Sequence, residues 1–292
     1  MRKPITILVI TATMLMAACN INTEPQTEPV TETSAEVSVT SETTTEFSSE
    51  TTSVETSESV LDSDCVVFGH YEQDGNLDNG PEPIVWDILD KEDGKMLLLS
   101  RYILDCHSFI DVSPYARTPE KIKWHSSLLR TWMNKEFLNN AFDKDEQQLI
   151  LTTELKTEKN PIYNVDGGKT TKDKVFCLSA EEVIKYYDFN LWDEERQSGY
   201  SQALLAEATP YAVSNHAYVY VIPEEEARGF IEMGYTEDLT GKEYSYWWLR
   251  SPGMNNRSVC YVSVHGFAGW DYNYFGGMVE VGVRPAIWIK SE

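Results

Sequence analysis

Two apolar runs that each carry an arginine lie near the C-terminus, and they constrain the fold more than any other feature. The first is Trp247-Trp248-Leu249-Arg250-Ser251-Pro252-Gly253, and the second is Gly282-Val283-Arg284-Pro285-Ala286-Ile287-Trp288. The segment between them is rich in Tyr, Asn, Ser and Gly. Antibody-combining loops have this composition, because aromatic rings give contact area at low entropic cost and small polar groups give adaptable hydrogen bonds. The pattern predicts a rigid β frame that displays a contact surface, which is typical of a binder rather than a catalyst.

The N-terminus has the pattern of an export signal. Met1-Arg2-Lys3 is followed by an apolar run from Ile5 to Met16 and then by Ala17-Ala18-Cys19. A basic start, an apolar stretch too short to span a bilayer and small residues before the cut are typical of a secretory signal. The end of this run is similar to a bacterial lipobox. We therefore predict a lipoprotein signal peptide at 1–18, lipidation of Cys19 with palmitate among the acyl chains, and anchoring at the extracytoplasmic face of the cell membrane. Ordinary cleavage that leaves a cysteine is the alternative.

The next segment, from Asn20 to about Asp64, consists almost entirely of Thr, Ser, Glu, Val and Pro. It has no Lys or Arg, its one aromatic residue is Phe47, and no helical or strand period runs through it. Such a segment cannot bury enough apolar surface to offset the entropy of ordering, and its Glu residues repel one another. We predict a disordered stalk at 19–64 and a folded domain at 65–292.

The chain is strongly acidic, with a formal net charge of −23. An acidic chain without a basic stripe is not suited to nucleic acid. The segment from Asp74 to Gly80 has oxygen ligands at alternate positions, as a calcium loop does, but its Gly falls one position late and Val85 stands where a closing Glu is needed. We interpret it as a hairpin turn and expect no cofactor, with calcium at this loop as the alternative.

Local patterns predict a β-meander, then helices, then further strands. Strands are expected at 66–69, 84–89 and 96–100, with Asp93-Gly94 as a hairpin turn, and at 175–178 and 218–221. Helices are expected at 126–142, from Asp143 onward, from Ser179 onward and at 223–233, and the chain after Tyr246 is expected to be β-structure. Because strands and helices do not alternate regularly, this order indicates an α+β fold with mainly antiparallel sheets and about three to four helices.

A series of motifs runs through the predicted domain. They are Phe68-Gly69-x-Tyr71, Pro83-Ile84-x-Trp86-x-x-Leu89, Leu97-Leu98-Leu99-Ser100, Trp124-x-x-Ser127-x-Leu129-Arg130-x-Trp132-x-Asn134, Lys174-Val175-Phe176-x-Leu178-Ser179 and the two arginine runs. In this order they resemble a bacterial family of exported proteins of unknown function with a C-type-lectin-like fold. That fold is shared with the formylglycine-generating enzymes and with the variable proteins of diversity-generating retroelements. The resemblance covers Val66 to Ile289.

The resemblance implies that the first and last strands pair and that the C-terminal loops form a ligand face. Within this frame we expect Trp247, Trp248 and Trp288 to be core aromatics. We expect Arg250 and Arg284 to be paired with carboxylates or backbone carbonyls, because an unpaired charge in an apolar strand would be costly.

The ligand is expected to bind between Asn255 and Phe275. Alternation in the run Val259 to His265 predicts one strand with Tyr261, Ser263 and His265 on the same face. Gly266 is expected to turn the chain toward Trp270, Tyr272 and Tyr274, the leading exposed anchors. The predicted contact residues are Asn255, Asn256, Tyr261, Ser263, His265, Phe267, Trp270, Asp271, Tyr272, Asn273, Tyr274 and Phe275. Adenine-directed mutagenesis of Asn codons yields many of these residue types but not Trp, so diversification by a retroelement stays open.

The predicted function is therefore a surface-anchored lipoprotein that displays a binding domain to an extracellular glycan or protein, as a receptor or adhesin. The alternative is an exported enzyme of the formylglycine-generating type, which would need paired reactive cysteines toward the C-terminus, where Cys260 lies with Cys177 far upstream of it. Cys65, Cys106, Cys177 and Cys260 are compatible with two disulfides or with buried thiols. A second candidate binding region is the segment from Leu191 to His216, with Trp192, Tyr200 and Tyr211.

Overall fold

The computed structural model describes residues 64–112, 120–271 and 273–291, which belong to one compact unit. The predicted signal peptide, Cys19, the predicted stalk up to residue 63 and Tyr272 lie outside the described residues. None of the helices in the described ranges has the length and apolar character needed to cross a membrane.

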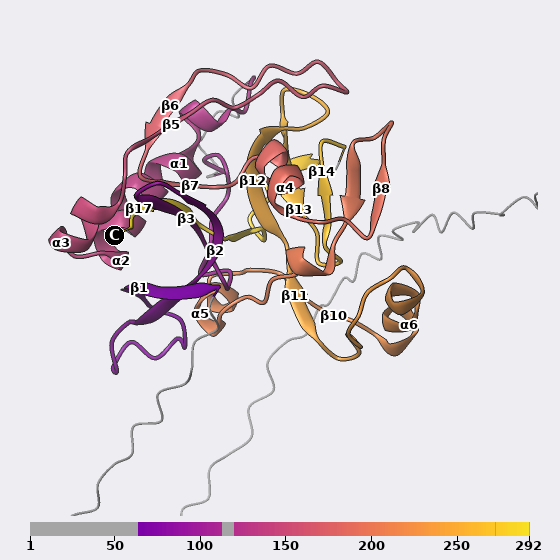
Figure 1. The fold of residues 1–292 in the computed structure, drawn as a ribbon, viewed down its shortest axis with the longest axis horizontal. Coiled ribbons are helices and arrows are strands. Elements are labelled where there is room, and N and C mark those ends of the chain that lie inside the picture. The colour runs from indigo at the N-terminus through magenta and orange to yellow at the C-terminus, as the bar shows by residue number, and fades with distance from the viewer. Residues whose placement is uncertain (1–63, 113–119, 272, 292) are drawn as a thin grey trace, which may run out of the picture. The chain divides into compact units, whose positions relative to one another are not determined.

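A five-stranded antiparallel sheet contains both the first and the last described strands (Figure 1). Its order is β1 (Cys65–Tyr71), β2 (Glu82–Glu92), β3 (Lys95–Ser100), β17 (Ala286–Lys290) and β7 (Val175–Phe176). The predicted Asp93-Gly94 turn is confirmed, since Glu92 pairs with Lys95 and Gly94 has a φ of 73°. That left-handed conformation favours glycine, which explains the Asp-Gly pair.

The last strand does not pair with the first one, so that expectation is wrong. The β2–β3 hairpin lies between β1 and β17, because the long strand β2 pairs with β1 over its first half, Glu82 to Asp87, and with β3 over its second half, Trp86 to Glu92. β17 instead pairs with β3 from Ala286 opposite Leu99 to Lys290 opposite Lys95.

A second five-stranded sheet brings the two arginine runs side by side. Its order is β15 (Asn273–Phe275), β13 (Ser258–Val262), β12 (Trp247–Pro252), β16 (Gly282–Val283) and β4 (Asp105–Cys106). β12 and β16 are parallel, with Trp247 opposite Gly282, and the other pairs are antiparallel. The short β15 therefore forms one edge of this sheet.

Three smaller antiparallel sheets complete the strands of the described part. One has the order β14 (Phe267–Gly269), β9 (Ser198–Tyr200) and β8 (Leu191–Asp193), and the others pair β10 (Val219–Val221) with β11 (Glu243–Ser245) and β5 (Thr153–Leu155) with β6 (Thr171–Asp173). With one parallel pair among many antiparallel ones, the α+β class with mainly antiparallel sheets is confirmed.

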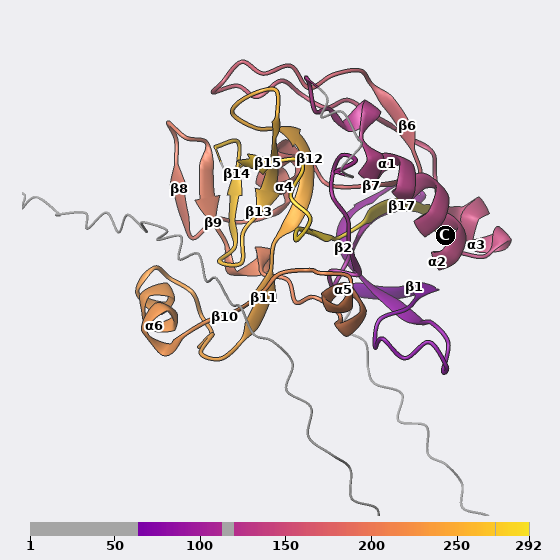
Figure 2. The same cartoon turned by 180° about the vertical axis from the view of Figure 1, so that it is seen from behind.

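The helices follow the capping signals of the sequence. They are α1 (Leu128–Trp132), which continues through the π-turn η2 (Met133–Phe137) into α2 (Leu138–Ala141), then α3 (Lys144–Leu149), α4 (Ala180–Tyr186), α5 (Pro210–Ser214) and α6 (Glu224–Glu232), with 3-10 turns η1 (Trp124–Ser126) and η3 (Gln202–Leu204). α3 and α4 each begin with a complete capping box, Asp143 with Glu146 and Ser179 with Glu182. Figures 1 and 2 show α2 and α3 beside the C-terminal strand and α6 beyond β10 and β11.

Two hydrophobic cores hold these layers together. The larger one packs both five-stranded sheets and the helices α1, α2 and α4 around the fully buried Trp86, Trp124, Trp247 and Trp248. The smaller one lies under α6 and contains Ile222, Phe230, Tyr235, Leu239, Tyr244 and Val264. The apolar surface buried in these two cores stabilises the sheets from which the C-terminal loops project.

Candidate functional site

Arg250 ties the central strand β12 to the start of α4. Its side chain is only 3% exposed and donates from Nη1 and Nη2 to the two carboxylate oxygens of Glu182, at 2.5 and 2.7 Å. Nη1 also donates to the carbonyl of Cys177 at 2.8 Å. Because Glu182 accepts from the backbone N of Ser179 as well, one carboxylate serves both the helix cap and the arginine.

Arg284 joins the two five-stranded sheets. Its Nε donates to the carbonyl of Ser100 at 2.7 Å, its Nη2 lies 3.3 Å from Asp87, and the guanidinium stands over the ring of Trp247. Trp247 and Trp248 are fully buried, and Trp248 Nε1 donates to the carbonyl of His107. Trp288 is only partly buried, because one side of its ring lies under Lys95 Nζ at 4.4 Å rather than within the core.

The hairpin ends of the second sheet form an open pocket of about 510 Å³, which we call the β15 pocket. Its walls are Met254, Asn255, Arg257, Ser258, Asn273, Tyr274 and Phe275. Tyr274 is 44% exposed and Phe275 38%, and Met254 is 51% exposed. Four of the predicted contact residues, Asn255, Asn273, Tyr274 and Phe275, therefore lie together in one concave surface.

Two glycines let the backbone approach the pocket side chains closely. A Cβ at Gly277 would lie 2.5 Å from Cε1 of Phe275, and one at Gly253 would lie 2.5 Å from both Asn273 Cβ and Ser258 Oγ. Neither contact is sterically allowed, so the ring of Phe275 and the side chain of Asn273 depend on bare backbone beside them. The guanidinium of Arg257 covers the ring of Phe275 at 5.2 Å from its centroid.

A fully buried amide, Asn160, holds the two loops that carry the pocket. Its Nδ2 donates to the carbonyls of Pro252 and Trp270 at 3.0 and 2.9 Å, and its Oδ1 accepts from the backbone N of Ile162 and Tyr163. This residue thereby links the end of β12 to the segment before β15. Asn160 was not among the predicted residues, because nothing in its sequence neighbourhood marks a buried amide.

A line of tyrosines leads away from the pocket across neighbouring strands. Tyr274, Tyr261, Tyr246 and Tyr218 contact one another in that order, with ring centroids 6.0, 5.5 and 5.4 Å apart. We call these four residues the tyrosine row. Tyr218 is 38% exposed, and Tyr246 and Tyr261 are partly buried. Tyr218 and Tyr246 lie outside the predicted segment, so only the three-dimensional pairing of the strands places them beside Tyr261.

Two predicted contact residues are buried, and the expectation that they are exposed is wrong. Trp270 is 5% exposed and packs in the larger core, because Gln197 and Asn160 bind its backbone N and carbonyl and draw the segment inward. Ser263 is 3% exposed. Its Oγ accepts from the backbone N of His265 and Phe267, which closes a turn. The strand therefore ends at Val262, and the predicted alternation does not continue to His265.

The other predicted residues are dispersed. His265 is partly exposed at the margin of the smaller core, where its ring packs on Tyr220 and Phe230 and its Nε2 is 3.2 Å from Glu226. Burial holds the pKa of His265 below its usual value, against the attraction of Glu226. Phe267 packs edge-on against Tyr200, Asp271 accepts from the hydroxyl of Tyr163, and Asn256 is exposed but does not line the pocket. Tyr272 lies outside the described residues.

The second candidate region lines a different hollow. Ser201, Gln202, Ala203 and Leu205 of the segment from Leu191 to His216 form one wall of an open pocket of about 720 Å³, with Tyr186, Tyr187, Asp188, Asn190, Thr236, Glu237 and Tyr244 around it. Trp192 and Tyr211 are not among its lining residues, and Tyr200 is buried. The three aromatic residues for which this region was a candidate, Trp192, Tyr200 and Tyr211, therefore do not line its pocket.

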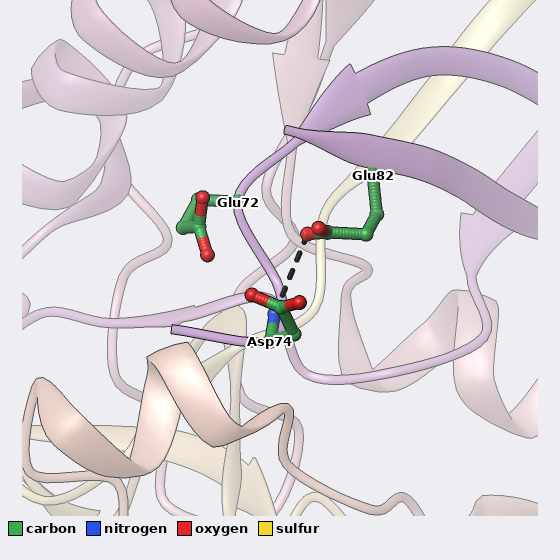
Figure 3. A group of neighbouring side chains, drawn as sticks. All are labelled: Glu72, Asp74 and Glu82. Carbon is green, nitrogen blue, oxygen red and sulfur yellow. Dashed lines mark hydrogen bonds between the residues drawn. The ribbon is translucent and has the colours of Figure 1, made fainter. Parts of the chain in front are cut away.

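Three carboxylates gather at the turn between β1 and β2, where Glu72, Asp74 and Glu82 each place an oxygen within 4.8 Å of the others (Figure 3). These oxygens already accept from the turn itself: Glu72 from Gly75 N, Asp74 from Asn76 N and Asn79 Nδ2, and Glu82 from Gln73 N, at 2.7 to 2.8 Å. The bonds from Asn76 and Asn79 hold the pKa of Asp74 below its usual value. The segment from Asp74 to Gly80 is thus a turn supported by its own side chains. A calcium ion takes six to eight oxygens, of which these carboxylates would supply a part.

The four cysteines of the described residues are buried and form no disulfide with one another. Burial raises the pKa of the thiols of Cys106 and Cys177 to about 12, and it raises the pKa of Cys260 further. A thiol acts as a nucleophile only as the thiolate, so these three groups are held in their unreactive form at neutral pH.

Comparison with known proteins identifies a family. Residues 93–291, more than half of the chain, match the model described as "Domain of unknown function (DUF6273)". The match begins at the turn before β3 and ends just after β17, the two strands that pair, so β1 and β2 precede it. Neither the curated proteins nor the solved structures contain a match to the chain.

Proposed function

Because the chain belongs to the family of domains of unknown function DUF6273, whose description names no ligand, we propose a function from the geometry of its own site. We propose that the protein is a binding module that holds an extracellular glycan or protein ligand at the β15 pocket, and that it binds without catalysis. One observation carries the proposal: Tyr274 and Phe275 stand exposed on a concave surface at the edge of a sheet whose central strand, β12, is buried along its whole length.

Exposure of aromatic rings to water is unfavourable in free energy, so rings held on a rigid sheet edge are effective anchors for a ligand. Full burial of a side chain of this size gains roughly 1.5–3 kcal/mol, and binding energy concentrates in a few such residues. The walls of Asn255, Asn273 and Arg257 add polar groups that fix orientation, as ligand pockets generally do. The tyrosine row extends this surface beyond the pocket.

The finer architecture is part of the same proposal. We propose that the domain is C-type-lectin-like, with the β3–β17 pair as its base and the C-terminal loops as its ligand face. The pairing of the outermost strands of the family-matched region and the position of the pocket in the loops between β12 and β15 support this proposal. Superposition of an experimental structure on C-type lectin domains tests it, and a different strand order around β12 would contradict it.

We also propose that a lipid on Cys19 anchors the protein at the outer face of the cell membrane. The support is the lipobox-like sequence that ends at Cys19. Fractionation of cells that express the wild type and Cys19→Ala tests this. We expect the wild type with the membranes and the variant in the soluble exported fraction, and equal membrane association of both would contradict the anchor.

The binding function is tested with an array of extracellular glycans and with pull-down of surface proteins. The double variant Tyr274→Ala/Phe275→Ala is expected to lose at least tenfold in affinity for any ligand that the wild type binds, because both anchors are removed. Its melting temperature is expected to fall only slightly, since both rings are already partly in water. Tyr102→Ala, which removes a ring that is 37% exposed on another surface, is the matched control and should bind as the wild type does. Unchanged binding by the double variant would place the site elsewhere.

A further inference from the structure

The β15 pocket differs from the rest of this acidic protein in its charge. The chain has 47 acidic residues against 24 basic ones, yet the pocket walls include Arg257 and no carboxylate. A concave surface with one positive group on a negative protein concentrates the local field at that group. The charge of the pocket is therefore complementary to an anion.

Arg257 also differs from five of the other six arginines among the described residues; Arg228, on α6, is the one other arginine of this part without a carboxylate within 4.0 Å. Within the described ranges, Arg101, Arg130, Arg196, Arg250 and Arg284 each lie within 4.0 Å of a carboxylate. No such contact involves Arg257 among the described residues; its guanidinium lies over Phe275, and its backbone N donates to Asn255 Oδ1. The ring holds the guanidinium in the pocket wall without neutralising it.

The side-chain amides of Asn255 and Asn273, which line the pocket together with the Arg257 guanidinium, each have one polar atom free to bond a ligand. Asn255 uses its Oδ1 for the backbone of Arg257, and Asn273 uses its Nδ2 for the carbonyl of Asp271. Among the described residues, Asn255 Nδ2 and Asn273 Oδ1 have no partner, so the walls offer a donor and an acceptor. Hydroxyl groups pair with both kinds of atom, whereas an apolar ligand would leave both unsatisfied.

We propose that the β15 pocket binds a sugar unit that bears a carboxylate, with Arg257 as the charge partner, the two asparagines as hydroxyl partners and Tyr274 with Phe275 as the ring contacts. The proposal rests on the binding function proposed above and names its ligand class. The planar guanidinium matches a carboxylate with two parallel hydrogen bonds. A volume of about 510 Å³ lies within the range of small-molecule sites, which suits one or two sugar rings rather than a folded protein surface.

The test compares oligosaccharides that end in glucuronic acid with the same oligosaccharides that end in glucose, titrated calorimetrically against the full mature chain. We expect the wild type to prefer the acid by roughly tenfold or more, since hydrogen bonds between two charged groups are stronger than those between neutral groups. Arg257→Gln should reduce the ratio of the two affinities to about one. Arg257→Lys should restore the preference in part, because lysine keeps the charge but cannot make the two parallel hydrogen bonds of a guanidinium. Arg228→Gln, which changes the net charge equally at an exposed position of α6, should keep the preference. Equal melting temperatures of the variants will show that all are folded.

The outcomes separate the two proposals. Equal binding of the acid and the glucose form, lost in Tyr274→Ala/Phe275→Ala, would overturn the carboxylate inference and leave the binding function standing. Binding of an acidic peptide in an Arg257-dependent manner, without either sugar, would overturn the sugar as the ligand class. A preference for the acid that survives Arg257→Gln would overturn the role of Arg257. Absence of any ligand sensitive to the double variant would overturn the binding function itself.

Discussion

Replacement of Arg250 by methionine is expected to destabilise the protein by about 3 kcal/mol. The variant loses two bonds to Glu182 and one to the carbonyl of Cys177, and breaking a buried pair from one side costs roughly 3–5 kcal/mol. The lower end of this range applies because the Glu182 side chain is 24% exposed, so water can hydrate its carboxylate once the arginine is gone. Arg250 Nε has no hydrogen-bond partner among the described residues, so its removal adds no further loss.

Urea unfolding of the protein, followed by tryptophan fluorescence, measures this effect. With a slope of about 3 kcal/mol per molar urea for a domain of this size, the midpoint should fall by roughly 1 M. Arg257→Met is the matched control, because it removes the same side chain from an exposed position on the same hairpin and should change stability by less than about 0.5 kcal/mol. Glu182→Gln combined with Arg250→Met should be less damaging than the sum of the single variants, since no unpaired carboxylate remains.

The reasoning would be refuted if Arg250→Met and Arg257→Met unfolded at the same midpoint. It would also be refuted by strict additivity in the double variant, because additivity would mean that Arg250 and Glu182 do not interact.

Three further predictions follow from buried groups of the frame. Trp248→Ala should cost about 3–5 kcal/mol in urea unfolding, because a fully buried ring and its bond to the His107 carbonyl are lost, and a wild-type midpoint would contradict its core position. Burial, with Lys169 and Arg130 nearby, holds the pKa of His125 below its usual value of about 6.5, so the unfolded chain takes up the proton more readily. Stability from this group is complete above about pH 6.5 and falls as the pH drops through the folded pKa. His125→Gln should therefore lose less stability than the wild type between pH 7.5 and 5, and an identical loss would refute this. Iodoacetamide at pH 8 should leave Cys106, Cys177 and Cys260 unmodified in the folded chain and modify them in urea; rapid labelling of folded Cys260 would contradict the inert thiols.

Elements with a local signal could be predicted from the sequence. The Asp93-Gly94 turn, the helix starts at Asp143 and Ser179, and the first strand, expected from Val66 and found from Cys65, each depend on a few neighbouring residues. α5 was missed although Thr209 caps it and Pro210 occupies its first turn, because a five-residue helix shows too little periodicity to be recognised.

The candidate site was harder to predict, because exposure is decided by partners distant in the sequence. Trp270 and Tyr274 stand in similar polar, aromatic surroundings, yet Asn160 and Gln197 draw the first into the core and β13 holds the second at a sheet edge. The alternation that favoured Ser263 and His265 ends at a turn made by the Ser263 side chain itself. Arg257 could have been identified from the sequence, because it is a lone cation within an aromatic segment of an acidic chain. A search for aromatic and amide residues alone does not find it.

The central claim is that the ligand occupies the β15 pocket, and the methyl resonance of Met254 tests it most directly. This side chain lines the pocket and is 51% exposed, whereas Met133 is fully buried and Met233 lies at the end of α6, away from the pocket. In a protein labelled at methionine methyl groups, with Met254 assigned through Met254→Leu, titration with the glucuronate-ended oligosaccharide should shift the Met254 signal in proportion to occupancy and leave Met133 and Met233 unchanged. Saturable binding that shifts Met233 and leaves Met254 in place would contradict the account.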